Sequence, residues 1–558
     1  MFSLKTATSC ATGQCRTAAN SRPRSQGRPT TVKFPACIAP AHTIEFSITM
    51  NTRSQICREL NALVDADPVK AIAAVRTSTT FARLSKTNAQ IIKSAIFIDA
   101  GSRIRSENAI SEGCDILRKL AINAPKDHNL SYNLANGLIA KADVLPVKRP
   151  DWYLSTADLR REARRLFQKV ADSNSSDEIK GRAVTNLGNS LYKANRWVEA
   201  YDNYFKALEF DPSNAVASTM AAKVLHMCIE RRIGDQKVLQ AIAAKHLKSA
   251  KVNIERLQEL GGERAIQQFK TLLQQTDSDV PQVSFTASSK YEKFVFENRL
   301  ALSPTIGGFA MSLKRWDNLK ILSITEGLNK DFNIPPIFTM MNTLKGDFLA
   351  ARRMAFDAIH HGPKDTGSYS DTLDYAVYGI RSSLLIFAQR ACLDILDKIA
   401  VALTEYFELG DNKKSIYFHH SRWFTKQSKI VTKRSWHPNF LKSINNGNGA
   451  IIALAEMALD LEENGFLCEQ KELRRAGTHR FVVLHDIGKS PSRECPYIDH
   501  FNTEDFKQII LHSLRLARAA IIYFVELIAF EERARSKGLK AFPLVVSEHH
   551  KIRRRNVW

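Results

Sequence analysis

Residues 181–214 read GRAVTNLGNSLYKANRWVEAYDNYFKALEFDPSN and indicate a pair of packed helices. Two small residues, Gly188 and Ala200, would let the helices approach closely, and Tyr204 would fill the space between them. Pro212 would end the second helix, because proline has no backbone N–H to donate. The stretch therefore predicts a unit of two helices that buries its apolar faces against neighbouring units.

The spacing of these residues fits a frame of 34 residues. Positions 7, 8, 20, 24, 27 and 32 of the frame are occupied by Leu187, Gly188, Ala200, Tyr204, Ala207 and Pro212. In these features the unit resembles a tetratricopeptide repeat. The frame continues upstream over residues 94–127 and starts again at residue 128, where residues 142–155 would form a lengthened loop. Stacked repeats leave a concave surface, so we expect a helical repeat array that binds a protein partner.

The bulk composition narrows the class of partner. A net charge of +23 and a pI near 9.6 favour nucleic acid first and an anionic membrane second. The longest apolar run, residues 519–530, is interrupted by Glu526 and is shorter than the roughly 20 residues that span a bilayer, so no membrane insertion is expected. The nine cysteines form no CxxC pair, which speaks against a zinc ribbon or a disulfide framework and favours the cytoplasm.

The 558 residues are too many for one hydrophobic core, so several domains are expected. The first 44 residues contain no Asp or Glu. This composition resembles a transit peptide, and it also fits a disordered leader before a native start at Met50. We predict an all-α chain with five parts: a disordered leader (1–49), a tetratricopeptide-like repeat array (50–275), a linker and connecting segment (276–334), a helical bundle (335–545) and a basic tail (546–558).

Four long helical patterns mark the predicted bundle. They run from about residue 338 to 361, from about 372 to 409, and from about 449 to 463, and the last begins near Asn502, with Asp505 as a capping signal. Long helices with apolar stripes favour an up-and-down bundle. Val, Ile and Tyr do not alternate for long anywhere, so an extensive sheet is not expected.

Within the bundle, residues 471–486 read KELRRAGTHRFVVLHD and place Arg474 five residues before His479. RNA is cleaved without a metal when its 2′-OH attacks the adjacent phosphorus, which requires proton transfer and stabilisation of the phosphorane. Histidine transfers protons near neutral pH, and arginine binds phosphate through two parallel hydrogen bonds. Five residues advance about 500° on a helix, so the two side chains would flank a groove rather than touch. Further phosphate contacts are expected from Lys471, Arg475 and Arg480.

The motif from Arg474 to His479 resembles the Arg-(four to six residues)-His signature of HEPN domains. Residues 342–352 (NTLKGDFLAAR) and 393–400 (LDILDKIA) are similar to a bacterial HEPN branch that is carried behind helical repeats, and the likeness covers about 335–545. Many members of this superfamily are dimeric ribonucleases that need no metal. The resemblance therefore implies a HEPN-like helical bundle in which Arg474 and His479 carry the catalytic roles.

The same resemblance implies a function for the whole chain. It would be a metal-independent endoribonuclease that leaves a cyclic phosphate and needs no cofactor, with a role in toxin or anti-phage defence systems and a homodimer formed through the C-terminal bundle. Arg475 and Thr478 stand where the branch usually has a polar residue, often Asn, and an acid. The alternative is a non-catalytic interaction protein, in which the repeats bind a protein and an inactive HEPN-like domain binds RNA or dimerises.

A second resemblance lies in residues 484–489, LHDIGK, which are similar to the His-Asp step of HD-type metal phosphohydrolases. There His485 and Asp486 could share a divalent metal and polarise a water. The other interpretation is a chance string at a helix end, with Gly488 as the cap. No metal is predicted elsewhere, because four ligands at a familiar spacing are not provided by His419 with His420 or by Cys495 with His500.

Overall fold

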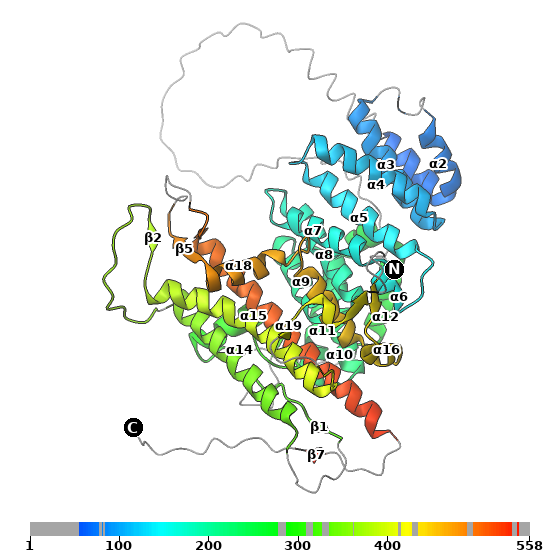
Figure 1. The fold of residues 1–558 in the computed structure, drawn as a ribbon. Coiled ribbons are helices and arrows are strands. Elements are labelled where there is room, and N and C mark those ends of the chain that lie inside the picture. The colour runs from blue at the N-terminus through cyan, green and yellow to red at the C-terminus, as the bar shows by residue number, and fades with distance from the viewer. Residues whose placement is uncertain are drawn as a thin grey trace, which may run out of the picture. The chain divides into compact units, whose positions relative to one another are not determined.

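A computed structural model describes residues 55–77, 81, 84–276, 286–308, 316–325, 334–360, 362–410, 415–426, 434–487, 495–537 and 544–545. The predicted leader (1–49) and the predicted basic tail (546–558) lie outside these residues. Helices dominate the described chain, so the all-α expectation is confirmed (Figure 1). No helix among the described residues is both long and apolar enough to cross a bilayer. The chain divides into two compact units, residues 4–145 and residues 146–558, and the limits of the five predicted parts stay predictions.

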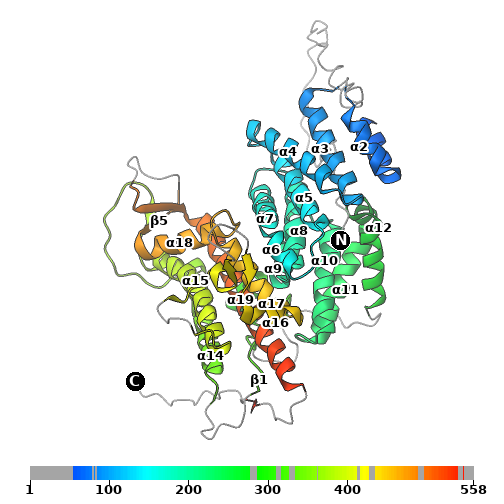
Figure 2. The same ribbon diagram turned by 45° about the vertical axis from the view of Figure 1, so that its right-hand side comes forward.

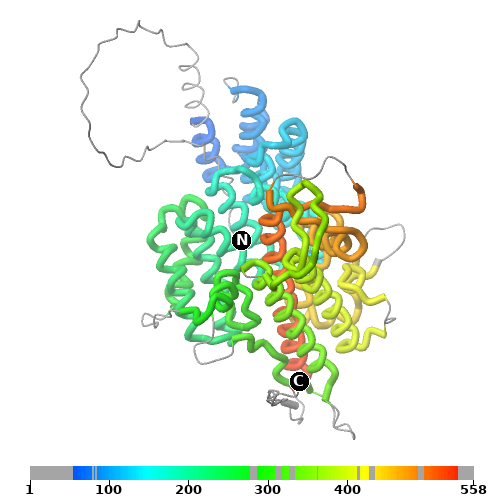
Figure 3. Tube along the Cα trace, turned by 90° about the vertical axis from the view of Figure 1, so that its left-hand side faces the viewer, coloured from blue at the N-terminus to red at the C-terminus, as the bar shows by residue number. Residues whose placement is uncertain are grey.

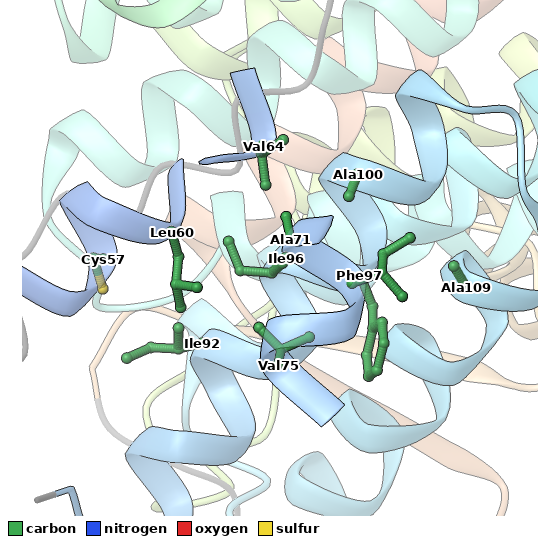
Figure 4. Close-up of a cluster of buried hydrophobic side chains, with 11 residues drawn as sticks. Cys57, Leu60, Val64, Ala71, Val75, Ile92, Ile96, Phe97, Ala100 and Ala109 are labelled. Carbon is green, nitrogen blue, oxygen red and sulfur yellow. The ribbon is translucent and has the colours of Figure 1, made fainter. Parts of the chain in front are cut away.

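The unit of residues 4–145 is built from consecutive helices that pack against one another. They are α2 (Pro68–Arg76), α3 (Lys86–Arg103), α4 (Glu107–Asn123) and α5 (His128–Val144). Two serines cap the N-termini, since the hydroxyl of Ser85 accepts from the Asn88 N–H and that of Ser106 from the Ala109 N–H. Figure 4 shows the core between residues 57–64, α2, α3 and the start of α4, to which Phe97 contributes a ring that is 1% exposed.

The second unit begins with further consecutive helices: α6 (Asp151–Ser155), α7 (Ala157–Ala171), α8 (Asp177–Lys193), α9 (Trp197–Phe210), α10 (Ala215–Glu230), α11 (Gln236–Val252) and α12 (Ile254–Gln274). Helices α7 and α8, α8 and α9, and α10 and α11 pack as neighbours, which confirms the repeat-like packing of consecutive helices (Figure 2). The predicted lengthened loop at 142–155 instead contains the end of α5 and the short helix α6.

The contact between α8 and α9 is the one that the sequence predicts. A Cβ atom added to Gly188 would stand 2.7 Å from Cε1 of Tyr204, so only glycine allows this approach. The Tyr204 ring is fully buried, and its hydroxyl donates to Oδ1 of Asn189 at 2.9 Å. Helix α9 ends at Phe210, directly before the turn that contains Pro212.

We expect Gly188→Val to lower the free energy of unfolding by about 1–3 kcal/mol, because a buried ring that is held by a hydrogen bond cannot move aside. Gly346→Ala on helix α14 (Pro336–His360) is the matched control, since a Cβ atom there meets nothing within 4 Å. The control should leave stability unchanged or raise it by up to about 1 kcal/mol. Urea denaturation followed by circular dichroism measures both, and equal stability of the two variants would contradict the packing argument.

The C-terminal part of the second unit is a helical bundle. Its helices are α13 (Lys290–Glu297), α14, α15 (Ile380–Tyr406), α16 (Pro438–Asn445), α17 (Gly449–Asp460), α18 (Cys468–His479) and α19 (Thr503–Ser536). Helices α14 and α15 lie side by side, and the long helix α19 contacts both of them as well as α17 (Figure 3). The predicted start of α19 is confirmed, because Oδ1 of Asn502 accepts from the N–H groups of Glu504 and Asp505.

Three small sheets accompany the helices. The strands β1 (Ser323–Ile324) and β7 (Leu544–Val545) pair antiparallel, as do β3 (Phe424–Lys426) and β4 (Arg434–Trp436). The third sheet has the order β2–β5–β6, with β2 (Ala376–Val377) antiparallel to β5 (Phe481–His485), and β5 parallel to β6 (Ile498–Asn502).

Two expectations about helix ends were wrong, because the strands of the third sheet occupy those positions. The helix expected to start near residue 372 begins at Ile380, because β2 and Gly379, with φ of +109°, precede it. The LHDIGK string does not lie at a helix end, since His485 closes strand β5. The predicted cap, Gly488, lies outside the described residues.

Candidate active site

Helix α18 carries the predicted catalytic pair. It packs on α15, and its apolar residues Leu473 and Ala476 are 7% and 1% exposed. The end of the helix is fixed by α15 as well, because Nη1 of Arg390 donates to the carbonyl oxygen of Gly477 at 3.3 Å. His479 is the last residue of the helix, and its side chain is exposed. The helix therefore presents the imidazole at a supported end rather than on a free loop.

An open pocket of about 410 Å³ lies along this helix. Its lining residues are Leu393, Leu396, Asp397, Tyr417, Phe418, His419, Leu461, Lys471, Arg474, Arg475, Thr478 and His479. Four of the five predicted site residues thus share one pocket, although Arg474 and His479 point in different directions around the helix axis. The fifth, Arg480, does not line this pocket, and its Nη2 instead lies 3.2 Å from Oδ2 of Asp499 on β6.

Arg474 is held by two carboxylates of helix α15. Its Nη2 lies 2.8 Å from Oδ1 of Asp394, and its Nη1 lies 2.7 Å from Oδ2 of Asp397. Asp397 is itself fixed, because its Oδ1 accepts from the N–H of Phe418 at 2.7 Å. A guanidinium has five N–H donors, and 31% of this side chain is exposed, so donors remain for a ligand in the pocket.

These two acids belong to residues 393–400, one of the segments that carried the family resemblance. Sequence reasoning did not connect them with Arg474. The signal was the spacing of three residues, which places Asp394 and Asp397 on one face of a helix. Their role is to orient the guanidinium, since two charge-assisted contacts from one rigid helix restrict its rotation.

The other cationic side chains of the pocket are also paired. Nζ of Lys471 lies 3.1 Å from Oε1 of Glu462, and Nη1 of Arg475 lies 2.7 Å from Oε1 of Glu472. Burial alone would raise the pKa of Glu462, but the nearby donor groups of His420 and Lys471 and the charges of His419 and Lys471 lower it to about 2. Each lysine and arginine that lines the pocket therefore has a carboxylate partner, and an anionic ligand has to compete with these acids.

The metal phosphohydrolase interpretation is not supported by the geometry around His485. This side chain is 2% exposed, and its Nδ1 lies 3.0 Å from the carbonyl oxygen of Asp374. A carbonyl only accepts, so the neutral ring carries its proton on Nδ1, and Nε2 accepts from Nδ1 of His500 at 2.8 Å. No lone pair is left for a metal, and Asp486 is exposed on the turn that follows.

A comparison with protein families finds a match for one part of the chain. Residues 328–531 match the family described as LA2681-like HEPN. The match covers α14 to most of α19, and it includes the pocket with all the residues that line it. A comparison with curated proteins gives no match.

Proposed function

We propose, from the premise that residues 328–531 form a HEPN-superfamily domain, that this domain is a metal-independent endoribonuclease. The observation that carries the proposal is the shared pocket, to which Arg474 and His479 both contribute. The pocket is open, and its wall contains groups that bind phosphate and a group that transfers protons. These are the two kinds of group that cleavage by transesterification requires.

In the proposed reaction, His479 accepts the proton of a ribose 2′-OH as the oxygen attacks the adjacent phosphorus. The P–O5′ bond breaks, the leaving oxygen takes up a proton from solvent, and a 2′,3′-cyclic phosphate remains. The free N–H donors of Arg474 stabilise the charge that develops on the phosphorane oxygens. Lys471 and Arg475 would bind the neighbouring phosphates, whereas Arg480 lies outside the pocket and would contact RNA further along.

The direct test is incubation of the purified chain with a mixed RNA pool in the presence and absence of EDTA. We expect cleavage in both, with 2′,3′-cyclic phosphate and 5′-hydroxyl ends. Activity that appears only with a divalent metal, or products with 5′-phosphate ends, would contradict the proposed chemistry. Size-exclusion chromatography with light scattering in the same buffer tests the proposed homodimer.

A second candidate function is RNA binding without cleavage. The observation that favours it is the pairing of Arg474 with Asp394 and Asp397, which occupies donors that the guanidinium would need to stabilise the phosphorane. In either case we propose that the repeat array binds a protein partner in the cytoplasm, in a toxin or defence system. RNA binding that depends strongly on salt, without cleavage under any condition, would favour this second function.

We expect Arg475→Gln to weaken RNA binding and to reduce the slope of log K against log salt by about 0.7, the value for one phosphate contact to a single strand. Arg353→Gln on α14 is the matched control. Both arginines are about equally exposed, at 60% and 57%, and each pairs with an acid one helical turn away. Fluorescence anisotropy over a salt series measures the slope. An equal change in both variants would mean that net charge, and not the pocket, sets RNA affinity.

A further inference from the structure

Three side chains, of which His419 lines the pocket, converge on one point. His419 and His420 stand at the start of the 3-10 turn His420–Arg422, and Glu462 follows helix α17. Nε2 of His419 lies 3.4 Å from Oε1 of Glu462, and Nδ1 of His420 lies 3.7 Å from the same oxygen. One ligand atom from each of the three residues lies within 4.8 Å of the others.

These separations agree with the geometry of a tetrahedral metal site. Zinc binds imidazole nitrogen and carboxylate oxygen at about 2.0–2.1 Å, so two ligand atoms of a tetrahedron stand about 3.3 Å apart. The distances of 3.4 and 3.7 Å from Glu462 to the two rings are close to that edge. Small movements of three half-buried side chains would complete the site.

A second observation concerns the buried nitrogen of His420. Its Nδ1 is shielded from solvent and makes no hydrogen bond among the described residues, since Oε1 of Glu462, 3.7 Å away, is beyond hydrogen-bond distance. A buried polar atom without a partner is costly, and an ion between Nδ1 and Glu462 would remove that cost. Nδ1 of His419 accepts from the backbone N–H of Ser421 at 3.2 Å, so the neutral ring carries its proton on Nε2. A metal at Nε2 has to shift that proton to Nδ1, where the Ser421 hydroxyl at 2.8 Å can accept it.

We propose that His419, His420 and Glu462 bind one divalent transition-metal ion of the zinc class. Two imidazoles and one carboxylate suit zinc, whereas magnesium and calcium prefer oxygen ligands alone. Three protein ligands leave a fourth position for water or another small ligand. The site is independent of the proposed RNA cleavage, which requires no metal, so either proposal can fail without the other.

The ion has one competitor in the structure, the ammonium group of Lys471. Its Nζ lies 3.1 Å from Oε1 of Glu462, where it provides part of the positive charge that an ion would bring. An ammonium and a divalent cation repel each other at this distance, so metal binding has to displace Lys471. Because Lys471 lines the pocket, the displaced side chain would become available to an anionic ligand there.

The test is a zinc titration of the full chain after dialysis against a chelator, followed by isothermal titration calorimetry and thermal unfolding. We expect one strong site and a rise in Tm with zinc. His420→Ala and Glu462→Gln should each weaken binding at least about 100-fold, since even outer-shell partners of a metal contribute about 10- to 100-fold. Lys471→Gln should tighten binding, which a purely structural ion pair does not predict.

Cobalt(II) substitution identifies the ligands. The proposed site should give the visible absorption of a tetrahedral nitrogen and oxygen site, without a thiolate charge-transfer band. Such a band would assign the metal to a cysteine and overturn the proposal. Zinc binding that is equal in the wild type and in His420→Ala would overturn it as well. Circular dichroism of each variant without metal shows whether it is folded, and His420→Asn replaces His420→Ala if that variant is not.

Discussion

His479→Ala is expected to lower RNA cleavage by about 10²- to 10⁴-fold while RNA binding changes little, because the variant loses the group that moves the proton of the 2′-OH. The side chain is exposed at the end of α18, so its removal leaves no cavity in the core. Single-turnover cleavage of an end-labelled RNA measures the rate, and anisotropy measures binding. The helical content should equal that of the wild type.

The matched control for this variant is Thr478→Ala. Thr478 lines the same pocket and is also exposed, and its hydroxyl donates only to the carbonyl oxygen of Arg474 within the helix. Its loss should change the cleavage rate less than about 10-fold, since it contributes no proton transfer. Full activity of His479→Ala, or equal losses in the two variants, would reject the role of His479.

Arg474 calls for a different comparison, because its removal also leaves two carboxylates without their partner. Arg474→Ala should lower cleavage by about 10²- to 10³-fold if the guanidinium stabilises the phosphorane. The variant that also carries Asp394→Asn and Asp397→Asn separates two explanations. Recovery of activity in that variant would show that Arg474 only screens the negative charge of the two acids. Continued loss supports direct contact with RNA.

Local sequence patterns predicted the parts of the fold that depend on neighbouring residues. The pairing of α8 with α9 follows from Gly188 and Tyr204, which stand within one helical unit, and the start of α19 follows from the cap at Asn502. The helix end expected at LHDIGK was wrong, because the chain before it forms the strand Phe481–His485, which is too short to show a period. Its pairing with β2 and β6 is a long-range property.

In the site, too, the local features were predicted from the sequence and the long-range contacts were not. The motif predicted that Arg474 and His479 belong to one site, and the pocket brings them together with Lys471 and Arg475. The acids that hold Arg474 lie on another helix, and Glu462 beside the two histidines follows α17, so both contacts depend on how distant segments pack. The spacing of Asp394 and Asp397 shows that they share a helix face, but a single sequence does not show which residue faces them, since separation along the chain has no fixed relation to distance in space.

The largest effect on stability is expected from Glu456→Ala, which should lower the free energy of unfolding by about 3–5 kcal/mol. Glu456 on α17 is 2% exposed, and its two oxygens lie 2.7 Å from the Nη atoms of Arg160 on α7. Its Oε2 also accepts from Nη2 of Arg164 at 2.8 Å, and Arg164 and Arg196 both pair with Asp460. Removing one carboxylate leaves buried guanidinium groups without compensation.

The exposed Glu463 is the matched control, and Glu463→Ala should change stability by less than about 0.5 kcal/mol.

The pH dependence of the free energy of unfolding of the wild type is a second test of Glu456. Burial alone would raise the pKa of Glu456, but the charges of Arg160 and Arg164 lower it to about 2. A lowered pKa stabilises the fold above the ordinary value of 4.5, so this contribution is lost between about pH 4.5 and 2. Glu456→Gln, which cannot ionise, should show a smaller loss of stability over that range.

The same residues determine how the second unit unfolds. Arg160 and Arg164 lie on α7, one of the helices with repeat-like packing. Glu456 and Asp460 lie on α17 in the HEPN bundle. Because this buried network joins the two parts, the wild type should unfold them in one transition that fluorescence and circular dichroism report at the same denaturant concentration. In Glu456→Ala the two probes should separate, since the bundle loses its strongest polar link to α7. Coincident transitions at wild-type stability would show that apolar packing alone holds the bundle to the helices that precede it.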